Sequence, residues 1–249
     1  MIKSFEKMFN ILALYSMERT SLSISEIQEE LGYPKSTIFR ILDTLEAFGY
    51  IERNPDNHRY SLGFNFFRLG SIVQSQLDFR TVSLPIMKEI ARETSETVEL
   101  NIMDGNNRIC IEKVDSPLDV RNFVRIGERK PLHLGASGKV LIAFLPDRVQ
   151  RQVLEELAQE EQIDMEKLKK DIVKIRSRGY EVTKGERVPG SFAVASPIFD
   201  HNGEIIASLT IAGPIQRLSD EREEKLIDTL LKGTKKICEQ MGYFQFPKN

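Results

Sequence analysis

The chain lacks the features of a membrane-inserted or exported protein. None of its apolar runs approaches the roughly 20 residues that a membrane-spanning helix needs. Its start, MIKSFEKMFN, has neither the basic beginning nor the long apolar core of a signal peptide. Cysteine is scarce, because only Cys110 and Cys238 occur and neither stands in a CxxC pattern. We therefore expect a reduced, cytoplasmic protein, and its 249 residues are enough for two domains.

A surplus of basic charge is also missing. The formal net charge is −2, and residues 1–63 hold seven Lys or Arg against nine Asp or Glu. Domains that bind nucleic acid are usually basic. Any DNA-binding function must therefore depend on where the cations lie, because their number alone argues against it.

Residues 1–63 have the pattern of three helices followed by a hairpin. The first segment has apolar residues at helical spacing, namely Phe5, Met8, Phe9, Leu12 and Tyr15. This spacing predicts a helix of about four turns with one apolar face. Ser23 and Glu26 have the spacing of a capping box at the start of a second helix, which Gly32 ends. Pro34 then suits the first turn of a third helix.

The third predicted helix has two different faces. The face expected to be buried holds Ile38, Ile41, Leu42, Leu45 and Phe48. The opposite face begins with short hydroxyls and long cations, which reach phosphates and base edges when a helix N-terminus enters the major groove. Two strands joined by an Asn-Pro-Asp-Asn turn follow and predict a wing. The residues expected to contact DNA are Lys35, Ser36, Thr37, Arg40, Arg53, His58 and Arg59.

Residues 1–63 thus predict a winged helix-turn-helix that binds duplex DNA. The alternative is a three-helix domain for protein contacts, in which Lys35 and Arg40 are merely solvated. Because the predicted patch is small, one copy should bind DNA weakly. We therefore expect a homodimer or tetramer that contacts two or more half-sites.

Residues 64–78 predict a linker helix. Its apolar residues lie on more than one side, and they are Phe66, Phe67, Leu69, Ile72, Val73 and Leu77. Such a helix is expected to be buried against a partner chain, although packing on its own domains alone is the alternative. The next helix is predicted over residues 84–94, with Pro85 inside its start.

Residues 79–249 mix strand and helix patterns and indicate an α+β domain. Alternation at residues 97–103 and 108–114 predicts a hairpin with one buried face, so Cys110 is expected to be an ordinary strand residue. Further strands are predicted at residues 121–126, from 179, at 192–199 and at 205–212, and helices at 140–145, 150–177 and 219–240. The last two strands are rich in small residues, which leave room for a ligand or for a packed helix.

The segment PLHLGASGK joins a strand to a helix and resembles an anion site more than a nucleotide site. Small residues there expose backbone N–H groups at a helix N-terminus, which attract an anion. Ser137 can also cap that helix, and the two roles are compatible. The segment is not a Walker A loop, because the first glycine is missing and Val140 stands where Ser or Thr would bind magnesium.

Constellations that carry chemistry are also lacking. His133 and His201 have no partner at metal-ligand spacing, and we find no Ser-His-Asp set, paired carboxylates or cysteine pair. We therefore expect no metal, no cofactor and no enzymatic activity.

Five segments in order resemble the isocitrate lyase regulator (IclR) family of bacterial transcription factors over nearly the whole chain. They are PKSTIFRILDTLEAFGYIERN, RYSLG, GERKPLHLGASGKVLIAFLP, IRSRGYEVTKGE and VASPIFDHNGEIIASLTIAGP. The resemblance implies a winged helix-turn-helix over residues 1–63, a linker helix over 64–78, and a GAF-like α+β effector-binding and oligomerisation domain over 79–249. It also implies control of a nearby catabolic operon by a small organic acid, and we expect a repressor rather than an activator.

The resemblance also implies where the effector binds. The site lies between the junction after the PLH motif, the loop after RGY and the last two strands. The matching positions here are Ala136 and Ser137, through backbone N–H, with Thr183, Ala193, Thr210 and Ala212. Family members that bind small acids have Asp, Cys and Ser at several of these positions. We therefore expect a more apolar pocket and a larger carboxylate with an apolar or aromatic body. The alternative is a DNA-binding regulator whose C-terminal domain only oligomerises.

Overall fold

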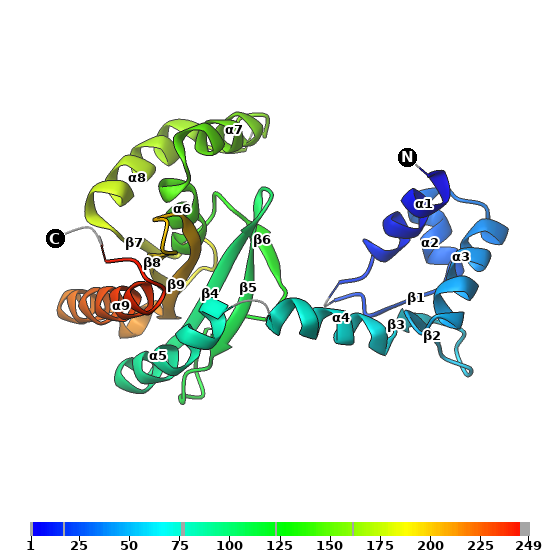
Figure 1. Cartoon of the computed structure of the whole chain (residues 1–249), viewed down its shortest axis with the longest axis horizontal. Coiled ribbons are helices and arrows are strands. Elements are labelled where there is room, and N and C mark those ends of the chain that lie inside the picture. Colours follow the sequence, from blue (N-terminus) through cyan, green and yellow to red (C-terminus); the bar gives the residue numbers. More distant parts are fainter. Residues whose placement is uncertain (1, 17, 76–77, 123, 161, 245–249) are drawn as a thin grey trace. The chain divides into compact units, whose positions relative to one another are not determined.

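The computed structural model describes residues 2–16, 18–75, 78–122, 124–160 and 162–244. It divides into two compact units, Met1–Leu77 and Asp78–Asn249 (Figure 1). The division falls one residue before the expected start of the C-terminal domain, so the predicted linker helix belongs to the first unit. In the described part of the chain, no helix is long and apolar enough to cross a membrane.

The N-terminal unit combines three helices with a small antiparallel sheet. The helices are α1 (Lys3–Leu12), α2 (Ile24–Leu31) and α3 (Lys35–Ala47). The strands are β1 (Ser21–Leu22), β2 (Ile51–Arg53) and β3 (Tyr60–Leu62), in the order β1-β3-β2. The predicted hairpin is therefore present, and β1 adds a third strand that the sequence patterns did not indicate.

Local capping fixes the start and end of α2. The Ser23 hydroxyl accepts a hydrogen bond from the Glu26 N–H, and the Glu26 carboxylate accepts one from the Ser23 N–H at 2.7 Å. These reciprocal bonds are the predicted capping box. Gly32 ends the helix in the left-handed region at φ +67°, where glycine has no steric penalty.

The core of the N-terminal unit is narrower than predicted. Its fully buried residues include Ile11, Ile27, Ile38 and Leu42. Phe5, Phe9 and Phe48 were expected on buried faces but are exposed. In α1 only Ile11 is buried, and the helix ends at Leu12, short of the four turns predicted. Phe48 is 70% exposed because it follows the last residue of α3, where the backbone has left the helical conformation.

Helix α4 (Phe64–Ser75) continues from the wing. Its start is tied to the N-terminal unit, since Asn65 Nδ2 donates to the Phe48 carbonyl at 2.7 Å and the Phe66 ring packs edge-on against Tyr50. Phe64 and Phe67 are 71% and 66% exposed in the single chain. The predicted apolar side chains of Val73 and Leu77 lie outside the described part of the chain.

The C-terminal unit is built on a six-stranded antiparallel sheet in the order β6-β5-β4-β9-β8-β7. The strands are β4 (Thr97–Asp104), β5 (Asn107–Val114), β6 (Arg129–Pro131), β7 (Glu181–Lys184), β8 (Ser191–Phe199) and β9 (Ile205–Pro214). The strand predicted at residues 121–126 is wrong, because the described residues there form no strand. That segment is held by side chains instead, since the Thr97 hydroxyl donates to the Asn122 carbonyl.

Helices cover both faces of this sheet (Figure 1). They are α5 (Asp78–Thr94), α6 (Ala136–Phe144), α7 (Asp147–Leu157), α8 (Met165–Arg178) and α9 (Asp220–Gln240), with a short 3₁₀ helix at Ile215–Arg217. Helices α5 and α9 pack on one face in a core that includes Val98, Leu100, Leu209 and Ile211. Helices α6, α7 and α8 form a second core on the other side. The predicted α+β class, with a helix-turn-helix domain before it, is confirmed.

Three predicted helix boundaries in this unit are wrong. Helix α5 begins at Asp78, not at residue 84, so Pro85 lies inside it. Proline removes only one backbone N–H donor, and the remaining hydrogen bonds maintain the helix. Helix α6 begins at Ala136, four residues before the predicted start. The single helix predicted over residues 150–177 is two, because the Asp164 carboxylate caps a new helix by accepting from the Lys167 N–H.

Candidate nucleic-acid interface and ligand cavity

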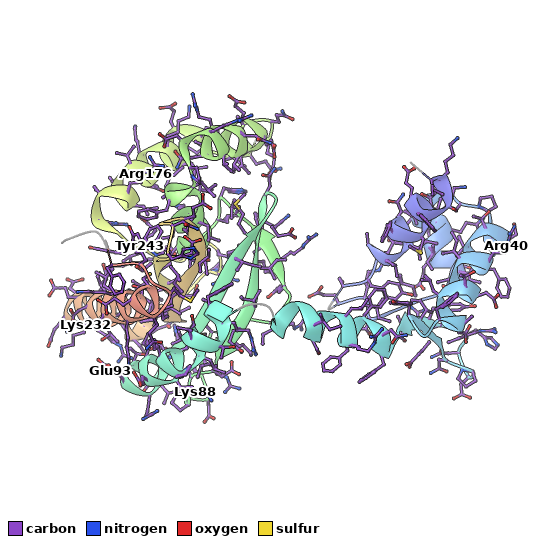
Figure 2. All side chains as sticks on the ribbon, viewed as in Figure 1. Arg40, Lys88, Glu93, Arg176, Lys232 and Tyr243 are labelled. Atoms are coloured by element: carbon purple, nitrogen blue, oxygen red, sulfur yellow. The ribbon has the colours of Figure 1, made fainter. Side chains whose placement is uncertain are left out.

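The predicted recognition helix, α3, presents its polar face to solvent. Ile38 and Leu42 are fully buried and fix the orientation of the helix. On the opposite side Lys35, Ser36 and Arg40 are exposed and Thr37 is half-buried. Figure 2 shows Arg40 pointing away from the body of the N-terminal unit. The first turn of α3 can therefore meet a phosphate or a base edge without any change of fold.

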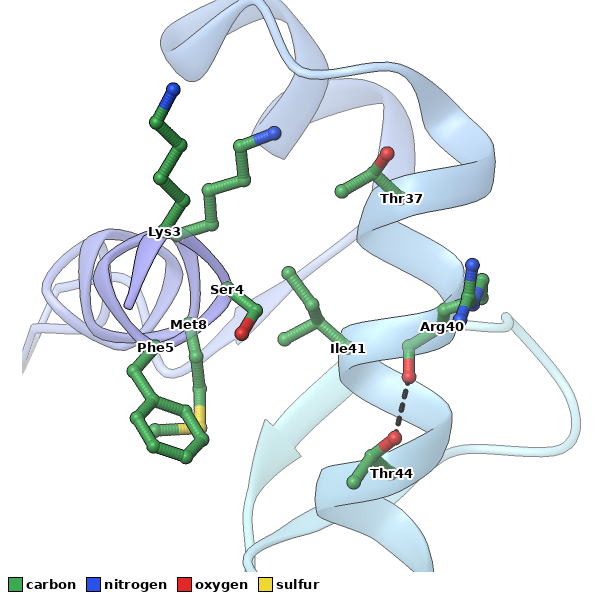
Figure 3. Close-up of a pocket in the computed structure, with 9 residues that line it drawn as sticks. Lys3, Ser4, Phe5, Met8, Thr37, Arg40, Ile41 and Thr44 are labelled. Atoms are coloured by element: carbon green, nitrogen blue, oxygen red, sulfur yellow. Dashed lines mark hydrogen bonds between the residues drawn. The ribbon is translucent and has the colours of Figure 1, made fainter. Parts of the chain in front are cut away.

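A groove of about 440 Å³ runs between α1 and α3 (Figure 3). Its lining brings Thr37 and Arg40 of α3 together with Lys3 and Lys7 of α1, while Ile41 points toward α1. Lys7 also lies over the Tyr33 ring, with its Nζ 5.3 Å from the ring centre. These two lysines were not among the residues predicted to contact DNA, although their spacing of four residues already places them on one face of a helix.

The wing is held in shape by its own side chains. Asn54 Oδ1 accepts hydrogen bonds from the N–H groups of Asp56 and Asn57, at 2.9 and 3.2 Å. Arg53 Nη2 lies 3.1 Å from His58 Nδ1, and because arginine can only donate, this ring nitrogen accepts. Arg53 and His58 therefore lie side by side next to the turn of the wing.

Arg59 has a different environment from the other predicted contact residues. Its guanidinium donates to the Ser21 hydroxyl and carbonyl at 3.0 and 2.8 Å, and pairs with the Glu26 carboxylate at 3.0 Å. Hydrogen bonds from Ser23 lower the pKa of Glu26 to about 2, and the contact with Arg59 adds to this effect. Arg59 thus braces the wing against β1 and α2.

The six residues predicted to bind an effector line a single cavity in the C-terminal unit. They are Ala136, Ser137, Thr183, Ala193, Thr210 and Ala212. The strand register explains why residues so far apart in sequence meet. Thr183 lies opposite Ala193, Ala193 opposite Ala212, and Thr210 one row away on the same face of the sheet. The cavity has a volume of about 20 Å³, enough for about one water molecule.

The N-terminus of α6 forms one wall of this cavity. Its N-cap is Gly135, so Ser137 lies inside the helix and does not cap it, contrary to that prediction. Gly138 is required because a Cβ there would overlap the Leu132 carbonyl group. Residues 136–143 are buried, and the first N–H groups of a helix have no partner within it. This wall can therefore donate hydrogen bonds to an anion.

The rest of the lining is more polar than predicted. Five polar or charged residues that were not predicted also line the cavity, namely Glu99, Arg108, Asn122, Glu186 and Arg187. Glu99 and Arg108 occupy alternating strands that the pattern assigned only to a hairpin with one buried face. Asn122 lies in the segment taken for a strand, and donates to Glu99 at 2.8 Å. The expectation of an apolar pocket is therefore wrong for the face formed by β4 and β5.

Comparison with known proteins identifies the family. The family model for the bacterial transcriptional regulator IclR C-terminal domain matches residues 72–239, and the IclR helix-turn-helix domain matches residues 4–55. The chain belongs to the IclR family of bacterial transcriptional regulators. The matched domains are those of regulators and not of enzymes, in agreement with the prediction from the sequence.

Relatives of this IclR-family chain match it along most of its length. The HTH-type transcriptional regulator KdgR of Escherichia coli K12 is 32% identical, over 99% of this chain and 95% of its own. The HTH-type transcriptional repressor AllR of the same strain is 30% identical, over 88% and 83%. The Thermotoga maritima IclR, whose crystal structure is known, is 30% identical in sequence. Its structure matches with a TM-score of 0.72 over 97% of this chain and 98% of its own. An IclR homologue from Microbacterium hydrocarbonoxydans, complexed with 4-hydroxybenzoate, shares the fold at 24% identity, with a TM-score of 0.83 over 96% and 98%.

A buried lysine holds the loop of the IclR-type cavity. Lys139 Nζ pairs with the Asp171 carboxylate of α8 at 2.8 Å and with the Glu186 carboxylate at 2.7 Å. Glu186 follows β7 and lines the cavity itself. These pairs keep Lys139 charged, since they raise its pKa against the opposing effect of burial. The loop after β7 is therefore fixed to α6 and α8 by charge.

The two cysteines of this IclR-family chain are structural. Cys110 lies in β5 as predicted, and burial raises the pKa of its thiol to about 12. Burial likewise raises the pKa of Cys238 to about 11. Both thiols therefore stay protonated at neutral pH. Among the described residues, no group of three or more His, Cys, Asp or Glu could hold a metal ion.

Proposed function

We propose that the protein is a cytoplasmic transcriptional repressor of a nearby catabolic operon. Its N-terminal unit binds operator DNA, and a small carboxylate in the C-terminal cavity controls this binding. The observation that carries the proposal is the start of α3, where Lys35, Ser36 and Arg40 are exposed to solvent and Thr37 is half-buried. The name of AllR, a transcriptional repressor, supports repression over activation.

Contact with DNA follows from the side chains that the N-terminal unit exposes. We assign Lys35, Ser36, Thr37 and Arg40 to the major groove and Arg53 and His58 to the backbone beside it. Arg59 contributes by bracing the wing, because its hydrogen bonds are used within the protein. Lys3 and Lys7 extend the cationic surface across the groove shared with α3.

Binding of a carboxylate is supported by the wall that α6 provides. The helix N-terminus is buried beside the cavity and carries a partial positive charge. The Microbacterium homologue was crystallised with 4-hydroxybenzoate, which is itself a carboxylate. The second candidate, a C-terminal unit that only oligomerises, would leave these polar groups without a role. A screen of carboxylic acids by thermal shift separates the two, because pure oligomerisation predicts no stabilisation by any acid.

Assembly into a homodimer or tetramer is supported by apolar rings on α4. Phe64 and Phe67 are exposed and pack against each other with ring centres 5.2 Å apart. Exposed aromatic pairs of this kind mark surfaces that bind another protein. We expect Phe67→Glu to lower the molar mass measured by light scattering, with Arg68→Glu, a neighbouring exposed position, as the control. An unchanged mass for the Phe67 variant contradicts this role for α4.

The DNA-binding proposal is tested by reversing the charge of Arg40. Arg40→Glu should abolish the footprint of the protein on the promoter regions beside its gene, because it places an acid where phosphate or a guanine edge is expected. Lys88→Glu in α5 makes the same charge change on the exposed surface of the C-terminal unit and should leave the footprint intact. Normal binding by the Arg40 variant shows that α3 is not the recognition helix.

A further inference from the structure

Arg108 is a buried guanidinium with an unused hydrogen-bond donor. It lies on β5 with its side chain only 2% exposed. One of its terminal nitrogens donates to Asn101 Oδ1 on β4, and the nearest Glu99 oxygen is 3.8 Å away, beyond hydrogen-bond distance. Its Nε has no hydrogen-bond partner. A buried donor without a partner costs stability, and more so when the group is charged.

The residue that carries this unused donor lines the cavity. Arg108 lines the same cavity as Ala136 and Ser137 at the N-terminus of α6. Burial lowers the pKa of Arg108 and Glu99 opposes that effect, but a guanidinium stays charged in either case. The N-terminus of α6 and the Arg108 side chain, both of which carry N–H donors, thus line one small space.

The nearby carboxylates, Glu99 and Glu186, are already engaged by partners other than Arg108 and the N-terminus of α6. The Glu99 carboxylate already accepts from Asn122 Nδ2 at 2.8 Å. Glu186 is paired with Lys139 on the far side of its loop. A second guanidinium, Arg187, also lines the cavity and acts on Arg108 as a like charge. The space between α6 and β5 therefore has donors in excess of acceptors.

We propose that Arg108 is the specificity-determining residue of this cavity. Its Nε donates to a second oxygen of the effector, while the N-terminus of α6 holds the carboxylate. The preferred effector is then a short acid with a hydroxyl, oxo or second carboxyl group near the first. This inference rests on the proposed function, because it assumes that the cavity binds a carboxylate.

The same geometry argues against an effector with an apolar body. An aromatic ring placed against β5 would cover the Arg108 donor without satisfying it, which is the costly arrangement. Thr183 and Thr210 on the neighbouring strands add hydroxyls that pair with further oxygens. Thr183, Ala193 and Ala212 differ from the side chains of family members that bind small acids. The polar residues on β4 and β5 compensate for this difference.

The test compares matched acids on the full-length protein by isothermal titration calorimetry. The pairs are lactate with propionate, malate with butyrate and gluconate with hexanoate, and benzoate serves as an aromatic acid. The wild type should bind the oxygen-rich member of at least one pair roughly 10- to 100-fold more tightly, as expected for one charge-assisted hydrogen bond. Benzoate should bind no better than the deoxygenated acids.

Three variants assign that preference to Arg108. Arg108→Met should remove the preference within the pair, and Arg108→Lys should keep binding to anions but lose most of the preference, because it retains the charge without Nε. The double variant Arg108→Met/Glu99→Gln removes both charges and replaces the single variant if circular dichroism shows that the latter does not fold. Arg151→Met in the exposed part of α7 is the matched control and should keep the preference.

The outcomes separate this inference from the proposed function. Retention of the preference by folded Arg108→Met overturns the role of Arg108 and leaves the carboxylate site standing. Equal binding of both members of every pair to the wild type also overturns it. If no acid binds the wild type, this inference and the effector part of the proposed function both fail, whereas DNA binding through α3 is judged by the Arg40 variant alone.

Discussion

Lys3 and Lys7 decide whether the DNA interface extends beyond α3 and the wing. Both line the groove that also contains Thr37 and Arg40, yet they come from α1. Replacing both by glutamine keeps a polar side chain, one atom shorter than lysine, and removes two positive charges. If these lysines face phosphates, the double variant Lys3→Gln/Lys7→Gln must bind duplex DNA with a weaker dependence on salt.

The size of this change follows from the cations that the N-terminal unit presents. Lys3, Lys7, Lys35, Arg40 and Arg53 give five per protomer around α1, α3 and the wing. Each phosphate contact contributes about 0.9 to the slope of log K against log salt, so a dimer that uses all five has a slope near −9. Loss of two lysines in each protomer brings the slope to about −5.4.

Fluorescence anisotropy measures these slopes with a labelled duplex of arbitrary sequence, because the counterion effect does not depend on the bases. The control is Lys88→Gln, which removes an exposed charge from α5 and should leave the slope unchanged. Unchanged slopes in both variants refute the extension of the interface to α1. A slope that falls equally in both variants refutes it too, because a general change of net charge then explains the effect.

Three further predictions concern stability and reactivity. The stabilisation that Glu26 gives is full above its unfolded pKa of 4.5 and is lost as the pH falls toward its folded pKa of about 2. Glu26→Gln, which can keep the capping box, should make the free energy of unfolding depend less on pH between those two values. Cys110 and Cys238 should not react with a thiol reagent at neutral pH in the native protein, and both should react in urea; rapid native labelling contradicts the burial of their thiols. Gly138→Ala should lower the free energy of unfolding by about 1–3 kcal/mol in urea melts, because its Cβ meets the Leu132 carbonyl carbon at 2.8 Å; an unchanged midpoint shows that the junction can shift.

Local signals predicted the N-terminal unit well. The capping box at Ser23, the glycine stop at Gly32 and the Asn-rich turn of the wing are each specified by a few neighbouring residues. The errors came where an apolar residue was assumed to be buried. Phe48 continues the helical spacing of α3 but lies past its last helical residue, and the signal for this end is Gly49, which follows in the left-handed region at φ +70°. Strand β1 was missed because two residues are too few for any periodicity to show.

The cavity was predicted only in part, since its residues come from every region of the C-terminal unit. The resemblance to a family supplied six positions that proved to share one lining. Arg108 was not predicted to line the cavity, because a charged residue in an alternating strand is normally assigned to the solvent-exposed face. Only the register of β5 against β4, with its irregularity after Leu100, places Arg108 beside Asn101 and Glu99. Long-range pairing of this kind cannot be derived from spacing within one strand.

The acidic composition of residues 1–63 does not exclude DNA binding, because a phosphate meets only the charges that lie near it. Arg19 and Arg59 form ion pairs with Glu30 and Glu26, so two cations and two acids neutralise each other around α2. Five cations then remain for α1, α3 and the wing, and five acids lie on the same elements, namely Glu6, Asp43, Glu46, Glu52 and Asp56. A phosphate responds to the charge within about 10 Å at moderate salt and not to the total. Net charge therefore does not decide whether this surface binds DNA, and the salt slope measures the cations that face phosphates.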